Sequence, residues 1–284
     1  MRSRIWRAAR WAALIVAIGA APPSALWAVA APGWWTPGPQ PSWQIQISST
    51  PKTILPVAVY DVDLFETPPA TIDAMHDRGI KVICYFSAGS YENWRPDKDE
   101  FPRDALGNKL GHWPGERWLD IRSDVVFRIM QERIDLARQK KCDAVDPDNV
   151  DVATNHPGFP ITLDEQLDYI LRLANAAHDA GLAIGLKNDV EQIPRLVGDV
   201  DFTVNEECFK YHECDTLQPF TAAGKPVFQI EYGRANKARK ICPQANALGF
   251  ATLIKKLNLG AQRIACADWP AASESRATAH PVFA

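Results

Sequence analysis

The sequence lacks several features that would assign it to other classes of protein. It has no excess of positive charge, since 31 lysines and arginines stand against 34 aspartates and glutamates and the net charge is -3. A nucleic-acid binder would normally carry a basic face, so we expect no nucleic-acid partner. No two cysteines have the C-x-x-C spacing of a metal site. The segment SAGS at residues 87–90 does not match the G-x-S-x-G elbow, which argues against a serine hydrolase.

The N-terminal region lacks an apolar run long enough for a membrane-spanning helix. Residues 11–21 are apolar, but Pro22 and Pro23 interrupt them well before the ~20 residues that a span requires. Four arginines precede this run, and the tripeptide AVA at residues 28–30 fits a cleavage site. We therefore expect residues 1–30 to be a signal peptide. The mature protein is expected to be secreted, without stable membrane association.

Six cysteines behind an export signal favour disulfide bonds, although their number alone does not determine the pairing. Cys208 and Cys214 are close enough in the sequence to close a small loop. Cys242 and Cys266 could connect the C-terminal part. Cys84 lies in an apolar segment and is expected to be a buried thiol.

Residues 31–42 are rich in proline and glycine, which predicts a linker or an arm against the surface. From residue 43 onward, segments typical of strands and of helices alternate. Several strand candidates are continuous apolar runs, as in parallel strands that are buried on both faces. The expected strands are residues 43–47, 54–60, 81–86, 143–146, 183–186, 202–205, 227–230 and 263–266.

The expected helices cover residues 71–78, 123–140, 162–180 and 246–257. Ser123 is placed to cap the second of these, and Thr162 forms a capping-box pattern with Glu165. Strands that alternate with helices predict an α/β protein with a single (β/α)₈ TIM barrel over residues 43–284. Residues 87–120 show little periodicity and are expected to form a long loop over the active face. We detect no internal repeat.

The most informative segment is CDAVDPDNVD at residues 142–151, where a short apolar strand ends in Asp146, Asp148 and Asp151. Crowding like charges is costly in a folded protein, so this cluster indicates function rather than packing. A second strand, within residues 201–208, ends in Glu206 and Glu207. The carboxyl ends of barrel strands meet on one face, so the two clusters favour acid/base chemistry there.

Other strand ends contribute amide, hydroxyl, aromatic and charged side chains to the same face. Sugars require aromatic surfaces and planar polar groups, and an excess of carboxylates suits a substrate that carries ammonium groups. Asp146 and Asp151 could instead cap local turns, and Lys187 could instead be a structural partner of the acids. The candidate substrate-binding residues are Tyr60, Asp61, Asp63, Tyr85, Glu92, Asp146, Asp151, Lys187, Asn188 and Glu231.

Asp148 and Glu206 are the candidate catalytic residues, because they follow the fourth and sixth expected strands and could face each other across the barrel. Glycoside hydrolysis needs two carboxyl groups, one a proton donor of raised pKa and the other a nucleophile or base. Glu207 should point to the other side of its strand. The acid cluster lacks the glycine and glutamate of a calcium loop, so we expect no metal site and no cofactor.

At these residues the sequence resembles glycoside hydrolase family 114, whose members are described as endo-α-1,4-polygalactosaminidases. The resemblance implies a TIM-like barrel and a secreted enzyme that cuts α-1,4-linked galactosamine polymers, which are cationic when deacetylated. It also implies that the catalytic pair of the family falls on Asp148 and Glu206. The motifs that carry it are WQIQI (43–47), YDVDLF (60–65), CYFSAGSYE (84–92), GERWLDIRS (115–123), DPDNVD (146–151), GLKN (185–188), NEECF (205–209) and KPVFQIEY (225–232).

Two alternative functions remain open on the sequence. A non-catalytic carbohydrate-binding barrel would keep the aromatic rim without needing both acids. A metal-dependent phosphodiester hydrolase would use the aspartate cluster as ligands. We expect a monomer whose partner is a cationic galactosamine polysaccharide.

Overall fold

The computed structural model describes residues 32–269. The predicted signal peptide over residues 1–30, residue 31, and residues 270–284 of the expected barrel domain lie outside this range. Within residues 32–269, no helix is both long enough and apolar enough to span a bilayer.

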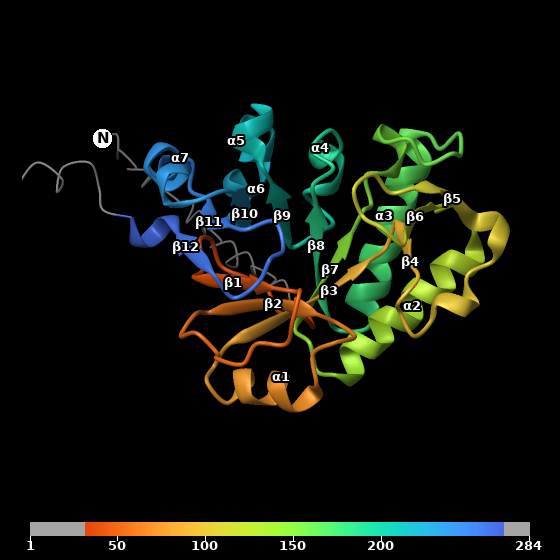
Figure 1. Cartoon of the computed structure of the whole chain (residues 1–284), viewed down its shortest axis with the longest axis horizontal. Helices are drawn as coiled ribbons and strands as arrows, with labels where there is room; N and C mark the ends of the chain where they lie inside the picture. The colour runs from red at the N-terminus through yellow and green to blue at the C-terminus, as the bar shows by residue number, and fades with distance from the viewer. Residues whose placement is uncertain (1–31, 270–284) are drawn as a thin grey trace, which may run out of the picture. The chain divides into compact units, whose positions relative to one another are not determined.

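The described residues build the expected (β/α)₈ architecture around one curved sheet (Figure 1). Eight strands run parallel to their neighbours, and a ninth pairs antiparallel with the eighth. In sheet order the strands are β1 (Trp43–Gln46), β2 (Val59–Asp63), β3 (Lys81–Ser87), β7 (Ala144–Asp148), β8 (Ala183–Lys187), β9 (Phe202–Glu206), β10 (Val227–Tyr232), β11 (Ala251–Lys255) and β12 (Arg263–Ala265).

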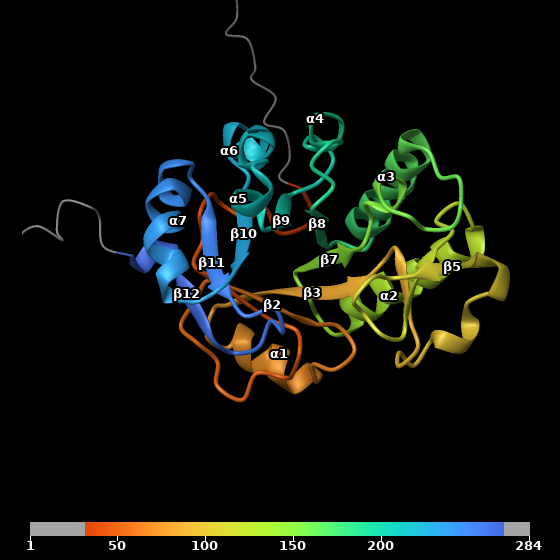
Figure 2. The ribbon, with the colours of Figure 1, turned by 45° about the horizontal axis from the view of Figure 1, so that its top comes forward.

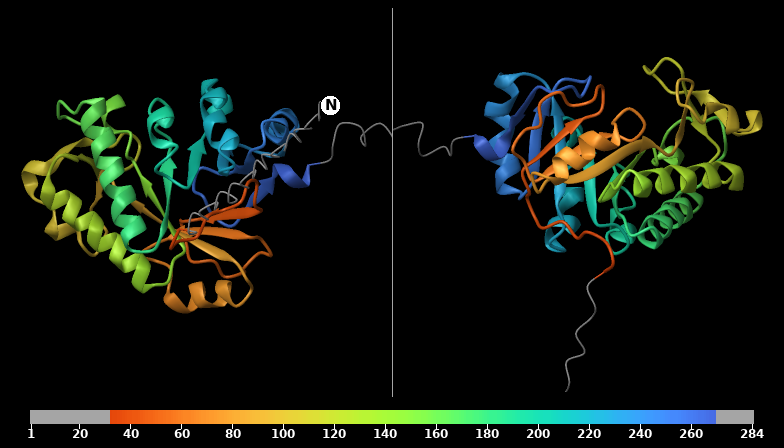
Figure 3. Two further views of the ribbon diagram at one scale, coloured as in Figure 1. Left: turned by 180° about the vertical axis from the view of Figure 1, so that it is seen from behind. Right: turned by 90° about the horizontal axis from the view of Figure 1, so that it is seen from below.

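Helices between the parallel strands cover the outside of the sheet, and α2 and α3 lie side by side there (Figure 3). Two of them begin at the caps that the sequence indicates. Ser123 accepts a hydrogen bond from the third residue of α2, and Thr162 forms a capping box with Glu165 at the start of α3. The helices are α1 (Pro69–His76), α2 (Asp124–Gln139), α3 (Leu163–Asp179), α4 (Ile193–Leu196), α5 (Cys208–Tyr211), α6 (Gln218–Ala222) and α7 (Ala235–Ala247).

The sheet curves until β1 lies beside β11, and side chains close the seam between these two strands. The ammonium of Lys255 donates hydrogen bonds to the side chain of Gln44 (2.9 Å) and to the carbonyl of Ile45 (2.6 Å). The Trp43 indole donates to the carbonyl of Ala251 at 2.7 Å. These bonds join the first and last parallel strands, so the barrel is nearly closed.

Alternation along the strands separates two apolar layers. An interior core inside the barrel holds Ile45, Val59, Ile83, Val204 and Ile230 together with their neighbours. The residues of opposite parity point outward and pack against the helices in a second, larger cluster. We call the phase of a strand the choice of which alternate residues point inward. The phase therefore decides whether a polar residue at the end of a strand faces the inside of the barrel.

The C-terminal part differs from the prediction in two elements. Residues 246–257 were expected as a helix, which is wrong: α7 ends at Ala247, Gly249 adopts a left-handed φ of 78°, and β11 follows. The expected eighth strand over residues 263–266 is β12, an antiparallel ninth strand. The last parallel position of the barrel is filled by β11, which contains Thr252, Leu253 and Ile254. Closing the barrel requires a strand at this edge, and this requirement outweighs the helical periodicity of the segment.

Residues 87–120, which were expected to form a long loop, contain regular secondary structure. They contain a small antiparallel sheet of β4 (Ser90–Glu92), β6 (Glu116–Leu119) and β5 (Leu106–Lys109), in that order, located near α2 (Figure 2). Arg95 fixes this extension to the barrel through two hydrogen bonds to Asp63, of 3.0 and 2.8 Å, and one of 2.8 Å to Glu92. Long-range ion pairs of this kind leave no periodic signal in the sequence.

Two matching clamps lie at the amino ends of the strands. Asp143 accepts hydrogen bonds from His76 and from a backbone N–H of β3, each at 2.9 Å. Asp201 accepts the same two kinds of bond, from His178 and from a backbone N–H of β8, again at 2.9 Å. The sequences HDRGIKV (76–82) and HDAGLAI (178–184) carry this repeat. The sequence analysis did not single out this short similarity between two α/β units.

The repeat places the two candidate catalytic acids at equivalent positions. Asp148 lies five residues after Asp143 at the end of β7, and Glu206 lies five residues after Asp201 at the end of β9. The partner residues Tyr85 and Lys187 are also equivalent, since each lies nine residues after the histidine of its clamp. Two copies of one α/β unit thus supply the acids and their nearest neighbours.

Three disulfide bonds cross-link the described residues. Cys208–Cys214 and Cys242–Cys266 match the pairings that the spacing indicated. The prediction for Cys84 was wrong, because it bonds to Cys142, 58 positions away, instead of remaining a thiol. Cys84 points outward from β3, toward the segment that leads into β7, and this tertiary proximity is invisible in the sequence.

Trp34 packs residues 32–42 against the barrel. Its indole donates to Asp201 at 3.0 Å and its ring stacks on His178 with centroids 3.8 Å apart. The N-terminal arm therefore contacts the second clamp.

Candidate active site

The carboxyl ends of the strands form the mouth of the barrel, and the strand phase directs a set of polar side chains into it. In each case the residue has the same parity as the apolar residues of the interior core. The structure brings together at this end Asp61, Tyr85, Asp146, Asp148, Lys187, Glu206 and Tyr232.

The ammonium of Lys187 lies at the centre of the acids. Its Nζ is 3.3 Å from Oδ1 of Asp148, 3.8 Å from Oδ2 of Asp146 and 4.0 Å from Oε1 of Glu206. Burial disfavours the charge on Lys187, but the carboxylates of Asp148, Asp146 and Glu206 outweigh it and raise the pKa of the ammonium. Lys187 is therefore a permanent positive charge within an acidic cluster.

Two hydrogen-bond donors hold the carboxyl group of Asp148 in place. The hydroxyl of Tyr85 donates to Oδ2 at 2.8 Å, and the backbone N–H of Asn149 donates to Oδ1 at 2.7 Å. The loop after β3 approaches closely, because a Cβ at Gly89 would lie 1.6 Å from the carbonyl oxygen of Asn149. Glycine at position 89 lets the two strand ends pack together.

Glu206 has different surroundings. The hydroxyl of Tyr232 donates to its Oε1 at 2.5 Å, and its backbone N–H donates to the side chain of Asn188 at 2.9 Å. Burial raises the pKa of Glu206 against the opposing effect of Lys187. A buried carboxyl of raised pKa is suited to hold a proton and deliver it.

The two candidate catalytic acids can serve one bond. Since Oδ1 of Asp148 is 3.3 Å and Oε1 of Glu206 is 4.0 Å from the same Nζ, these oxygens lie at most 7.3 Å apart, the sum of the two distances. Both side chains remain partly accessible, with exposed fractions of 19% and 26%. Carboxyl groups at this range can act on opposite sides of a glycosidic linkage.

Asp61 and Asp146 lie in the same cluster but are fully buried. None of their four carboxyl oxygens has a hydrogen-bond partner among the other described residues. Burial and the neighbouring Asp146 raise the pKa of Asp61 well above its usual range. Burial also raises the pKa of Asp146, to about 7, although Lys187 opposes this effect. This pair lies inside the barrel, out of reach of solvent.

The structure does not bring Asp63 and Glu92 to the acids around Lys187. Both pair with the buried guanidinium of Arg95, which also lies over the Phe65 ring at 4.9 Å. Glu92 is 3.9 Å from Arg133 as well. These two carboxylates belong to the contact between the barrel and the 87–120 extension.

Tyr60 and Glu231 have the opposite strand phase and point away from the mouth. The hydroxyl of Tyr60 accepts a hydrogen bond from the backbone of Leu55 at 3.0 Å. Glu231 accepts from the backbone of Phe209 at 3.0 Å and pairs with Lys237 at 2.8 Å. Both side chains are buried in the layer outside the barrel wall.

Asp151 lies just beyond the acids, beside a carboxyl that the sequence analysis did not single out. Burial and the charge of Asp148 raise the pKa of Asp151 to about 6. Burial and Asp151 raise the pKa of Asp189 to about 8. One oxygen of Asp189 accepts a hydrogen bond from Gln166 at 2.8 Å, and the other has no partner.

Glu207 turns away from the mouth. It adopts a left-handed φ of 64°, and its side chain is 2.5 Å from the ammonium of Lys210 and 3.9 Å from that of Lys237. Of the two consecutive glutamates, Glu206 alone lies beside Lys187.

The candidate site residues predicted from the sequence leave out two partners of the acids, Tyr232 and Asn149. Tyr232 lies two residues after Ile230, a member of the interior core, so strand alternation could have indicated its inward direction. The contribution of Asn149 comes from its backbone, which carries no signal in the side-chain pattern.

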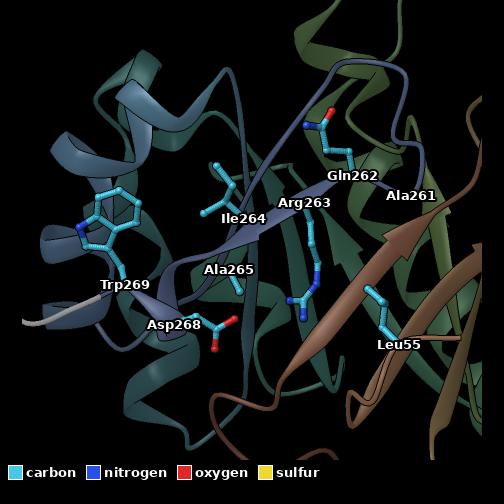
Figure 4. Close-up of a pocket in the computed structure, with 8 residues that line it drawn as sticks. All are labelled: Leu55, Ala261, Gln262, Arg263, Ile264, Ala265, Asp268 and Trp269. Carbon is cyan, nitrogen blue, oxygen red and sulfur yellow. The ribbon is translucent and has the colours of Figure 1, made fainter. Parts of the chain in front are cut away.

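Two hollows on the surface lie apart from the acids. One, of about 670 Å³, runs along β12 and is lined by Arg263, Ile264 and Trp269 among others (Figure 4). The other, of about 700 Å³, is lined by Phe65, Trp94 and neighbouring residues. Neither is lined by an acid of the Lys187 cluster, which sits in the barrel mouth. In residues 32–269, no group of three or more His, Cys, Asp or Glu side chains is arranged to hold a metal ion.

Comparison with known proteins assigns this arrangement to one family. The model of the glycoside-hydrolase family GH114 matches residues 24–269. The crystal structure of Ega3 from Aspergillus fumigatus in complex with galactosamine is 43% identical, covers 82% of this chain and 97% of that chain, and has a TM-score of 0.79.

A more distant solved structure shares the fold alone. The glycoside hydrolase domain of PelA from Pseudomonas aeruginosa is 14% identical, covers 79% of this chain and 98% of that domain, and has a TM-score of 0.64. A search of the curated proteins found no significant match.

Proposed function

The chain belongs to glycoside-hydrolase family GH114, and from this premise we propose that it is a secreted enzyme that cleaves α-1,4-linked galactosamine polymers at internal bonds. The observation that carries the proposal is the pair Asp148 and Glu206 on either side of Lys187. The 43% identity to Ega3, whose structure contains galactosamine, supports the choice of sugar.

Glu206 is the proposed proton donor. Burial raises the pKa of Glu206, so the carboxyl group keeps its proton to a higher pH than a free glutamate. It protonates the glycosidic oxygen as the bond to the anomeric carbon breaks, and a water molecule supplies the hydroxyl group that ends up on that carbon. Tyr232 and Asn188 orient it through its side chain and its backbone, respectively.

Asp148 is the proposed charged carboxylate. The hydroxyl of Tyr85, the N–H of Asn149 and the ammonium of Lys187 all stabilise its negative charge. That charge faces the anomeric carbon, where positive charge develops in an oxocarbenium-like transition state. The donors fix the carboxylate in place before the reaction, so no reorganisation is needed at the transition state.

The acidic mouth also suits a cationic polymer. Even with a proton on Glu206, the carboxylates of Asp148 and Asp146 outnumber the single ammonium of Lys187, so the mouth attracts ammonium groups on the substrate. Asn188 and Asp151 lie next to the pair and are proposed to line the cleft. Three disulfide bonds among the described residues support export, since such bonds persist in oxidising compartments.

The test is to incubate the purified protein with deacetylated and with acetylated galactosamine polymer and to follow both reducing ends and product size. We expect reducing ends to accumulate while the average chain length of the deacetylated polymer falls early, as for internal cleavage. Binding without new reducing ends would instead support a carbohydrate-binding barrel. Activity that a chelator abolishes would support the metal-dependent alternative, which Lys187 disfavours because its ammonium already pairs with these acids.

A further inference from the structure

The buried pair of Asp61 and Asp146 is a feature that the proposed reaction does not use directly. Both residues have an exposed fraction of 0%, so neither solvent nor a sugar ring reaches them. Burial raises the pKa of Asp61 most, and the carboxyl group of Asp146 is the neighbour that raises it most. No backbone or side-chain group of any other described residue donates to their four oxygens. The two carboxyl groups lie within hydrogen-bonding reach of each other.

Two carboxylates cannot stay charged in such an environment. Leaving a buried charge without a donor costs several kcal/mol, and a second like charge in contact adds to that cost, so the pair retains a proton. One proton between the two groups supplies the missing donor, because a neutral carboxyl can donate to a carboxylate. The orphaned oxygens are therefore explained by a shared proton.

The proton belongs mainly on the Asp61 side. Oδ2 of Asp146 lies 3.8 Å from the ammonium of Lys187, which favours the charged form of Asp146. Asp61 lies farther from Lys187 in the cluster, and burial together with the charge of Asp146 favours its neutral form. The resulting order is a neutral Asp61, a charged Asp146 and then Lys187.

We propose that Asp61 and Asp146 share one proton and act as positioning residues, which hold Lys187 between Asp148 and Glu206 without contacting substrate. The role in catalysis rests on the proposed function, whereas the shared proton does not. The pair also balances the charge beneath the reacting carboxyl groups, since a fully ionised Asp61 would add another negative charge there. The titratable groups that face Asp146 are Asp61 from β2, Tyr85 from β3, Asp148 on its own strand, Lys187 from β8 and Glu206 from β9.

The shared proton is tested without substrate. Infrared difference spectra at neutral pH should show that Asp61→Asn removes the C=O stretch of one neutral carboxyl group relative to the wild type. The exposed acid Asp215 provides the matched control, and Asp215→Asn should leave the C=O band of the neutral carboxyl groups unchanged. An Asp61→Asn spectrum that retains every neutral carboxyl band of the wild type overturns the proposal, whatever the enzyme cleaves.

The positioning role is tested by comparing isosteric and truncated variants. An amide at position 61 can still donate to Asp146, so Asp61→Asn should retain about ten times more of the kcat than Asp61→Ala.

Asp146→Asn removes a negative charge that faces Glu206, which lowers the pKa of Glu206. The basic limb of the kcat profile should then move down by about one pH unit, with KM changing less than kcat.

Two activity results would contradict the positioning role while leaving the proposed function intact. One is an equal kcat for Asp61→Asn and Asp61→Ala, which would show that the donor at position 61 is unimportant. The other is an Asp146→Asn enzyme that is slower but keeps the wild-type pH profile, as a purely structural role would give. Absence of polymer cleavage by the wild type would instead remove the proposed function and leave the infrared result to decide on the proton.

Discussion

At the scale of single residues, Asp148 and Glu206 differ in the groups that surround them. Asp148 receives hydrogen bonds from Tyr85 and Asn149 and lies 3.3 Å from Lys187. Glu206 receives one side-chain hydrogen bond, from Tyr232, and lies farther from the ammonium. Two carboxyl groups at equivalent positions of a repeated unit thus have different hydrogen-bond partners and different distances to the same ammonium.

Asp148→Asn and Glu206→Gln should each lower kcat by roughly 10²–10⁴-fold, because each removes one half of the acid/base pair while preserving its shape. The matched control is Glu207→Gln, since Glu207 pairs with Lys210 and turns away from the mouth. This control should retain kcat within about threefold of the wild type, because the Glu207 carboxyl group pairs with Lys210 and Lys237 and not with Lys187. Reducing-end assays give the rates, and circular dichroism verifies the fold; a fully active Glu206→Gln enzyme would exclude Glu206 as the proton donor.

Tyr232→Phe should move the basic limb of the kcat profile to higher pH. The Tyr232 hydroxyl stabilises the charged form of Glu206, so its removal raises the pKa of Glu206 further and keeps the proton donor protonated longer. We expect a shift of up to about one pH unit. Tyr211→Phe, at an exposed tyrosine of α5, is the control and should leave the profile in place. A shift toward lower pH would contradict the assigned role of Glu206.

At the scale of elements, the barrel positions the acids by repeating one device. In each copy an aspartate before a strand accepts from a histidine and from the backbone of the neighbouring strand, and the acid lies five residues farther on. The fixed clamp sets the phase of β7 and of β9, so Asp148 and Glu206 both face inward. The 87–120 extension adds Glu92 and Arg95, which fix the end of β2 through Asp63.

The disulfide bonds should differ in how much they stabilise the fold. In the chain-entropy model the bond between Cys84 and Cys142, with a separation of 58, contributes about 4 kcal/mol, and that between Cys208 and Cys214, with a separation of 6, about 2 kcal/mol. Replacing both cysteines of the first pair by alanine should therefore lower the free energy of unfolding more than the same change in the second. Guanidinium denaturation of the two double variants measures the difference, and the reverse order would show that loop length does not control it.

At the scale of the whole molecule, the net charge of -3 and the acidic mouth predict salt-dependent binding of a cationic polymer. Raising the ionic strength from about 0.01 M to about 0.5 M should increase KM for deacetylated polymer roughly tenfold, because the Debye length falls and screens the attraction. The value of kcat should change little, since the buried ion pairs around Lys187 are screened much less. Initial rates at several salt concentrations provide the measurement, and a KM independent of salt would argue against electrostatic capture.

The sequence by itself determined the barrel, most strand positions and the two acids at strand ends. These features depend on local patterns: apolar runs mark buried strands, caps such as Thr162 with Glu165 start helices, and an acid after an apolar run marks the end of a strand. The segment 246–257 shows the limit of such patterns, because closing the barrel requires a strand where the periodicity favours a helix.

Only the tertiary structure decided which side chains meet. Strand phase directs Asp61 and Tyr232 inward but Tyr60 and Glu231 outward, and the phase is set by contacts between distant segments. The central position of Lys187 likewise arises because β7, β8 and β9 lie side by side in the barrel. The charged groups that shift the pKa values in the candidate site come from strands far apart in the chain. Local sequence patterns therefore do not specify the distances between these groups, which are set by the packing of the strands in the barrel.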